Sequence, residues 1–136
     1  MGQQQLLLIV LGVIVVGIAV VVGINLFNAN AVSSNRDAVV SDLNNLGAMA
    51  QQYYKKPISM GGGGNTFDGT GGTGGVAWVI PPQLDTTANG TYTFSIPDAQ
   101  HVTIVGTGTE TGNDGSTPVQ ATATVSPTAI TVVTNN

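Results

Sequence analysis

The sequence has no cysteine and very little charge. Without cysteine no disulfide can stabilise the chain, and cysteine usage says nothing about its redox compartment. Charged residues make up 7% of the 136 residues, whereas an ordinary soluble protein has about 25%. A surface with so few charges is usually buried against lipid, against other copies of the chain, or under glycan. The length allows at most one small domain besides any terminal segment.

Basic residues are especially scarce. The only three are Arg36, Lys55 and Lys56, and from Pro57 onward every charged residue is an acid. These acids are Asp68, Asp85, Asp98, Glu110 and Asp114. Because nothing in this half of the chain can neutralise phosphate groups, we expect no nucleic-acid binding by the isolated chain.

The groups that carry most enzyme chemistry are also sparse. His101 is the only histidine, and its place on a threonine-rich strand predicts a solvent-facing side chain. The seven acids are scattered, and no serine lies in a G-x-S-x-G turn. The glycine-rich stretch 61–75 lacks Gly-Lys-Ser/Thr, so we interpret it as a flexible connector and not as a phosphate-binding loop. We therefore predict that the protein is not an enzyme and binds no cofactor.

One candidate metal site remains to be weighed. Asn113 and Asp114, with Asp98 as a third group, offer oxygen ligands of the kind that calcium takes. The run Asn-Asp-Gly is, however, far more common as a turn. We favour the turn and predict no metal.

A long apolar run opens the chain. Leu6 to Ile24 is nineteen residues without a charge, which is long enough to cross a membrane. We interpret residues 1–30 as one apolar helix. Three glycines along it, Gly12, Gly17 and Gly23, lower its helix propensity. We predict that they are soft points, where the helix is locally weak and can stretch.

An amphipathic pattern follows in residues 31–56. Its apolar residues recur at three- and four-residue spacing, and the opposite face is polar. They include Val39, Leu43, Leu46, Ala50 and Tyr53. No proline separates the two patterns, so they predict one helix of about 54 residues, with Lys55-Lys56 near its end and Pro57 after it.

The rest of the chain is strand-like. Residues 57–90 are predicted to form a glycine-rich loop with a short strand at 76–80, and residues 91–136 an antiparallel sheet of about four strands. The expected strands are 91–96, 101–107, 119–125 and 128–134. Such a sheet is too small to stand alone and needs the amphipathic half of the helix to cover it. Trp78, Tyr53 and Tyr54 are the expected aromatic residues of this core. The fold class is α+β.

These four segments, in this order, resemble a type IV pilin. The resemblance implies a pilin-like fold and a structural role as the subunit of an extracellular helical filament. The apolar half would serve first as an inner-membrane anchor and then as the filament core. The implied partners are identical subunits and a pilus assembly machinery. Two alternatives stay open: a pseudopilin of a type II secretion system, and a single-pass membrane-anchored binding module.

The N-terminal residues depart from the family pattern, in which a basic leader is cut after glycine and the fifth mature residue is glutamate. No basic leader is seen here. If Met1 is the mature first residue, Gln5 replaces the glutamate; if processing follows Gly2, Leu7 does. A neutral amide is easier to bury than a carboxylate. We therefore expect Gln3, Gln4 and Gln5 to form a polar collar that assembles across subunits, the alternative being glutamines at a membrane edge. The apolar assembly residues that follow are Leu6, Leu7, Leu8, Ile9 and Leu11.

The second half of the chain is rich in threonine. Residues 66–136 contain 17 threonines and no lysine or arginine. Asn89-Gly90-Thr91 is an N-glycosylation sequon in a predicted turn, so Asn89 is a candidate acceptor. We expect this half to face water and to carry glycan.

Overall fold

The computed structural model describes residues 2–136. One helix dominates it: α1 (Gln3–Lys55) runs for 53 residues, close to the predicted length, and extends about 80 Å. It ends where expected, because the Lys56 N–H donates to the carbonyls of Gln52 and Tyr53 and Pro57 cannot continue the helix.

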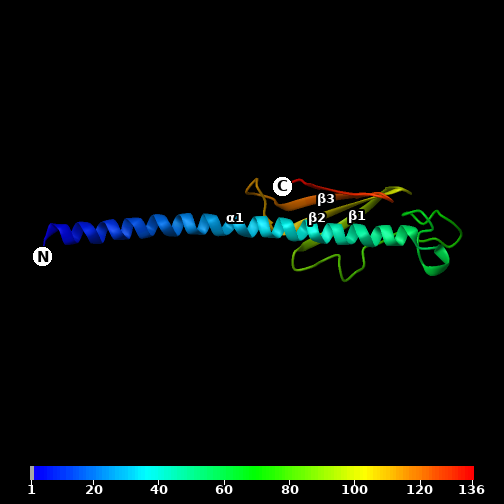
Figure 1. The fold of residues 1–136 in the computed structure, drawn as a ribbon, viewed down its shortest axis with the longest axis horizontal. Helices are drawn as coiled ribbons and strands as arrows, with labels where there is room; N and C mark the ends of the chain where they lie inside the picture. Colours follow the sequence, from blue (N-terminus) through cyan, green and yellow to red (C-terminus); the bar gives the residue numbers. More distant parts are fainter. Residues whose placement is uncertain (1) are drawn as a thin grey trace.

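The two halves of α1 have different surroundings. The first half projects from the rest of the molecule as an isolated rod, and the second half lies along the sheet (Figure 1). The residues of α1 that are buried all belong to the second half: Val39, Leu43, Leu46, Gly47 and Ala50. We call residues 31–136 the head and residues 3–30 the apolar half.

The sheet is a four-stranded antiparallel meander. Its strands, paired in chain order, are β1 (Gly90–Asp98), β2 (His101–Thr111), β3 (Pro118–Val125) and β4 (Ile130–Thr134). Each overlaps one of the four expected strands. Pairing is irregular between Ser95 and Asp98 and between Thr107 and Thr111. The predicted α+β fold, with a long helix on a small sheet in the pilin-like layout, is confirmed.

The core lies between the second half of α1 and one face of the sheet. Besides Tyr92, its sheet side consists of short and branched residues: Val102, Ile104, Ala121, Ala123 and Val125. Two glycines let the layers approach closely. A Cβ at Gly106 would lie 2.8 Å from the Val39 side chain, and one at Gly47 would lie 3.0 Å from Ile130.

The aromatic residues pack between the helix, the loop and the sheet. Trp78 is buried and meets Phe94 edge to face, with ring centroids 5.5 Å apart. Tyr53 and Tyr54 are partly buried against the core, and the Tyr54 ring lies 4.9 Å from that of Phe67. Trp78 is therefore a core residue as predicted, whereas the tyrosine pair packs at the edge of the core; fully buried Phe67 is an addition from the loop.

The short strand predicted at 76–80 is wrong. These residues form no strand, although Trp78 and Ile80 are buried and Val79 is exposed. The alternation is real, but no neighbouring strand pairs with the segment: the Trp78 N–H donates to the Phe67 carbonyl, 2.8 Å away, in the loop. The rest of residues 57–90 is loop apart from one short 3-10 helix, η1 (Ile58–Met60), and an isolated bridge between Thr86 and Thr91.

Candidate assembly surface

The apolar half of α1 presents a continuous apolar surface to its surroundings. Every large apolar side chain from Leu6 to Phe27 is between 54% and 74% exposed. A contiguous apolar surface of this size marks a site of contact with protein or lipid. The helix is also long and apolar enough to cross a membrane, and none of its most apolar stretch is buried within the fold.

The three glutamines lie on the first turn of α1. Gly2 precedes the helix with extended backbone, and its carbonyl accepts from the Gln5 N–H at 3.2 Å. Consecutive residues point about 100° apart around a helix, so Gln3, Gln4 and Gln5 face three different directions. All three are exposed, and their side chains hydrogen-bond to nothing within residues 2–136. Each amide is therefore available to a neighbour on its own side of the rod.

Gln3 and Gln4 each line a shallow groove between apolar side chains one turn further on. One shallow groove is lined by Gln3, Leu6, Leu7 and Val10, and the next by Gln4, Leu7, Leu8 and Leu11. Gln5 and Ile9, four residues apart, share a face in the same way. The structure thus places all eight predicted assembly residues together at one end of the rod. Grooves of this kind accept the side-chain ridges of another helix.

The two N-terminal registers begin at Met1 and at Gln3. Met1, the first residue of one register, lies outside the described residues. Gly2, the candidate processing site, is exposed and is the residue just before the helix.

The three helix glycines have open space around them. A Cβ at Gly12, Gly17 or Gly23 would meet nothing within 4 Å outside the helix backbone. Packing within one chain therefore does not require glycine at these positions. The helix is unbroken through all three in the single chain, and their softness in a filament stays a prediction.

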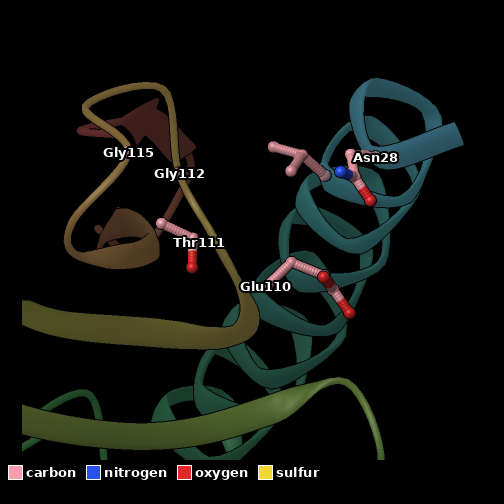
Figure 2. Close-up of a pocket in the computed structure, with 6 residues that line it drawn as sticks. Asn28, Glu110, Thr111, Gly112 and Gly115 are labelled. Carbon is pink, nitrogen blue, oxygen red and sulfur yellow. The ribbon is translucent and has the colours of Figure 1, made fainter. Parts of the chain in front are cut away.

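A cleft of about 410 Å³ lies where the apolar half meets the head. Asn28 and Val32 line it from α1, and Glu110 lines it from the end of β2 (Figure 2). The loop between β2 and β3 closes the third side with Gly112 and Gly115. We call it the junction cleft. Sequence reasoning missed it, because its two walls come from distant parts of the chain.

Asn35 holds the two walls of the junction cleft in place. Its amide nitrogen donates to the Asn89 carbonyl at 2.9 Å, and its amide oxygen accepts from the backbone N–H of Thr109 and of Glu110, at 3.1 and 3.3 Å. A Cβ at Gly108 would clash with the Asn35 side chain. One helix residue therefore fixes the end of β2 beside α1, which orients the side of the cleft that carries Glu110.

The structure does not bring the candidate calcium ligands together. Asp98 and Asp114 lie beyond opposite ends of β2, and no three His, Cys, Asp or Glu side chains gather anywhere in residues 2–136. Asp114 instead accepts from the N–H of Ser116 and of Thr117, at 3.0 and 2.9 Å, as a turn residue does. Hydrogen bonds from the Thr117 hydroxyl and from these backbone N–H groups hold the pKa of Asp114 well below its usual range.

His101 is exposed, as predicted. Its Nδ1 lies 2.8 Å from the Asp98 carboxylate. The backbone N–H of Gln100 and the imidazole both lower the pKa of the Asp98 carboxyl group. This exposed contact closes the turn between β1 and β2 and is an ion pair only when the imidazole is protonated.

The candidate glycan acceptor is already engaged. Asn89 is half-buried, and its amide nitrogen, the atom that would carry glycan, donates to the Asp42 carboxylate at 3.0 Å. A glycan would replace one of the two amide hydrogens of Asn89, so attachment in the folded head has to leave the other hydrogen facing Asp42.

Asp42 is the centre of a cluster that sequence reasoning did not find. The same carboxylate oxygen accepts from the Tyr92 hydroxyl at 2.6 Å and from the Thr87 hydroxyl at 3.3 Å. Burial, with this hydrogen bond and the negative charge of Asp42, raises the pKa of Tyr92. The cluster ties the loop before β1, and β1 itself, to the middle of α1.

Comparison with known proteins adds no relative to this description. No family model, curated protein or solved structure matches the sequence significantly.

Proposed function

We propose that this chain is the structural subunit of an extracellular, type IV pilus-like helical filament, assembled through the apolar half of α1. The observation that carries the proposal is the division of a single unbroken helix. One half packs on a sheet to make a small head, and the other half projects with its apolar surface uncovered. Bundled with copies of itself, that half would make an apolar core coated by heads.

The energetic reason for assembly is burial of this surface. Each large apolar side chain contributes roughly 1.5–3 kcal/mol when it is fully removed from water. Residues 6–27 can be removed from water only by contact with lipid or with another apolar surface. We propose that the inner membrane covers this apolar surface first, and that identical helices cover it later in the filament. Transfer from one to the other would require the pilus assembly machinery that the family resemblance implies.

A membrane-anchored binding module also needs an apolar helix, but two features favour the filament. No flexible linker separates the anchor-length segment from the part that packs on the head, so the head is held rigidly in line with the rod. In addition, the glutamines are neutral, and they can enter a bundled core without stranding a charge. A pseudopilin remains the nearest alternative, since its product differs mainly in length.

The test is electron microscopy of filaments sheared from the cell surface, with N-terminal sequencing of their subunit. The proposal predicts long filaments whose main component is this chain. A short periplasmic fibre would favour the pseudopilin. Sheared material without the chain, which then stays entirely with the membrane fraction, would contradict the filament and favour the anchored module.

A further inference from the structure

Charged side chains without an ion-pair partner in residues 2–136 lie at both ends of the head: Lys55 and Lys56 at one end, which also carries the acids Asp68 and Asp98, and Glu110 at the other. Lys55 and Lys56 lie at the end of α1 furthest from the apolar half and are the exposed cations of the head (Figure 1). No carboxylate lies within 4.0 Å of either one in residues 2–136, where the single ion pair is that of His101 and Asp98. These two lysines therefore have no partner in their own subunit.

The acids at the same end of the head are occupied elsewhere. Asp68 accepts from the N–H and hydroxyl of Thr70, at 3.0 and 2.7 Å. Asp98 accepts from the Gln100 N–H at 2.7 Å and pairs with His101. Neither acid neutralises the lysines directly.

The junction cleft, at the other end of the head, presents the complementary charge. Glu110 is exposed, and its carboxylate accepts no hydrogen bond and pairs with no cation in residues 2–136. Its side chain extends from the end of β2 beside the cleft, and the Asn28 amide lies above it on α1 (Figure 2). Arg36 is the one cation on this part of α1; it does not line the cleft and forms no ion pair with Glu110.

The lysines and Glu110 cannot meet within one chain. Val32 lines the cleft and Lys55 ends the helix, so about 35 Å of helix separates the two ends of the head. If apolar halves bundle in parallel, all heads point the same way along the fibre. A shift of about one head length then brings the lysine end of one head to the junction cleft of another.

We propose that the junction cleft binds the Lys55–Lys56 end of a second copy of this chain, with Glu110 as the partner of the lysine ammonium groups. The inference rests on the proposed filament and adds a specific contact between heads. The contact is heterologous, because different surfaces of the two copies meet, and so it propagates along an open helix and does not close a dimer. Asn28 and Thr111 add hydrogen-bonding groups at the same rim.

A charge-exchange series on the full-length chain tests the contact. Fibres are grown from detergent-solubilised subunit by detergent removal, and the lowest subunit concentration that gives fibres is measured. Glu110→Lys alone, and Lys55→Glu with Lys56→Glu, should each raise that concentration roughly two- to fivefold or more at low salt. The three changes together should return the lowest fibre-forming concentration to its wild-type value. Raising the salt to about 1 M should bring the fibre-forming concentrations of all variants closer to that of the wild type, because charges are then screened within about 3 Å.

Asp85→Lys is the matched control. It makes the same charge change at another exposed acid of the head, away from both ends, and it should leave assembly unchanged. Glu110→Lys and Asp85→Lys should keep the melting temperature of the head, since both side chains are exposed and form no bonds within residues 2–136. Lys55→Glu with Lys56→Glu should lower it slightly, because it places acids at the C-terminal end of α1.

Crosslinking gives a second readout, because the chain has no cysteine of its own. Fibres that carry Lys56→Cys with Glu110→Cys should give a ladder of multimers with a short bismaleimide. Either cysteine alone, or Asp85→Cys with Glu110→Cys, should give no ladder.

The outcomes separate the contact between heads from the filament itself. Restoration by charge exchange together with the ladder supports the contact. If wild-type fibres form and the reversals have no effect, or the exchange fails to restore assembly and no ladder forms, the contact is wrong while the filament stands. If the wild-type chain forms no fibres on detergent removal and is also absent from filaments sheared from the cell surface, the filament and the contact both fail.

Discussion

Asp42 shows at the residue scale how the head is held together without disulfides. Its carboxylate oxygen accepts from Tyr92, Asn89 and Thr87, which belong to the loop before β1 and to β1 itself. A single carboxylate on the helix therefore fixes a segment that has few other backbone pairings. Hydrogen bonds to a charged group are stronger than neutral ones, typically about 1.5–3 kcal/mol.

Tyr92→Phe should destabilise the head by about 1–3 kcal/mol at neutral pH, because Asp42 loses its shortest hydrogen bond. The same hydroxyl predicts a pH dependence. The pKa of Tyr92 is raised in the folded head, so the wild-type head should lose stability as pH rises above about 10, where the unfolded tyrosine ionises. The phenylalanine variant should not show the part of this pH-dependent loss that comes from Tyr92. Chemical denaturation of the soluble head at pH 7 and pH 11 measures both effects. Tyr54→Phe is the control, since its hydroxyl bonds Gln100 at the surface; equal losses in the two variants would contradict the special role of Asp42.

Gln5 tests whether the collar is an amide contact between subunits. An unpartnered buried amide costs about 1–3 kcal/mol, so partners across subunits are expected in a bundled core. Gln5→Leu should weaken fibres only mildly, whereas Gln5→Lys should weaken them strongly by adding a cation at low dielectric. Gln5→Glu should keep fibres if a neighbour's amine lies close, and should make assembly acid-dependent otherwise. If none of the three changes alters the fibre yield, the collar lies in solvent and makes no contact between subunits.

At the element scale, α1 is one helix with two environments. Its second half is specified by packing, since Val39, Leu43 and Leu46 are buried under the sheet. Its first half has no buried residue, so its own backbone hydrogen bonds and the apolar surroundings in which it lies must stabilise it.

The apolar half should be dispensable for the head and necessary for assembly. All buried residues of α1 lie at or beyond Val39, so a chain lacking residues 1–28 retains the whole core. It should be a soluble monomer with the same circular dichroism in the strand region, as measured by analytical ultracentrifugation and spectroscopy. Fibres formed by this fragment would show that the apolar half is not the assembly element.

The three glycines offer a separate test of the same element. Ala at Gly12, Gly17 and Gly23 meets no obstacle within the chain, and each should favour the helix by about 1 kcal/mol. If the glycines supply a soft segment for leaving the membrane, the triple variant should show slower hydrogen exchange across residues 12–23 and fewer surface fibres. Undiminished fibres with slowed exchange would rule out a role for the softness.

At the scale of the whole molecule, much of the fold could be predicted because it follows local patterns. The apolar run, the amphipathic spacing and Pro57 determine α1, and alternation between turns determines the four strands. The segment at 76–80 also alternates, yet it is a loop, because alternation reports burial and does not supply a partner strand. Phe67 lies in a glycine-rich stretch with no periodic pattern, so nothing local indicated its burial. The Asp42 cluster and the junction cleft depend on contacts between distant segments, which no local pattern reveals.

The central claim is that the apolar halves form the core of a filament and the heads its coat. A helical reconstruction by electron cryomicroscopy of fibres from the full-length chain tests it most directly. The account predicts parallel rods of residues 6–27 around the fibre axis, with the heads outside and Glu110 of one head facing Lys55 and Lys56 of another. Heads at the axis, or apolar halves on the outer surface of the fibre, would contradict it.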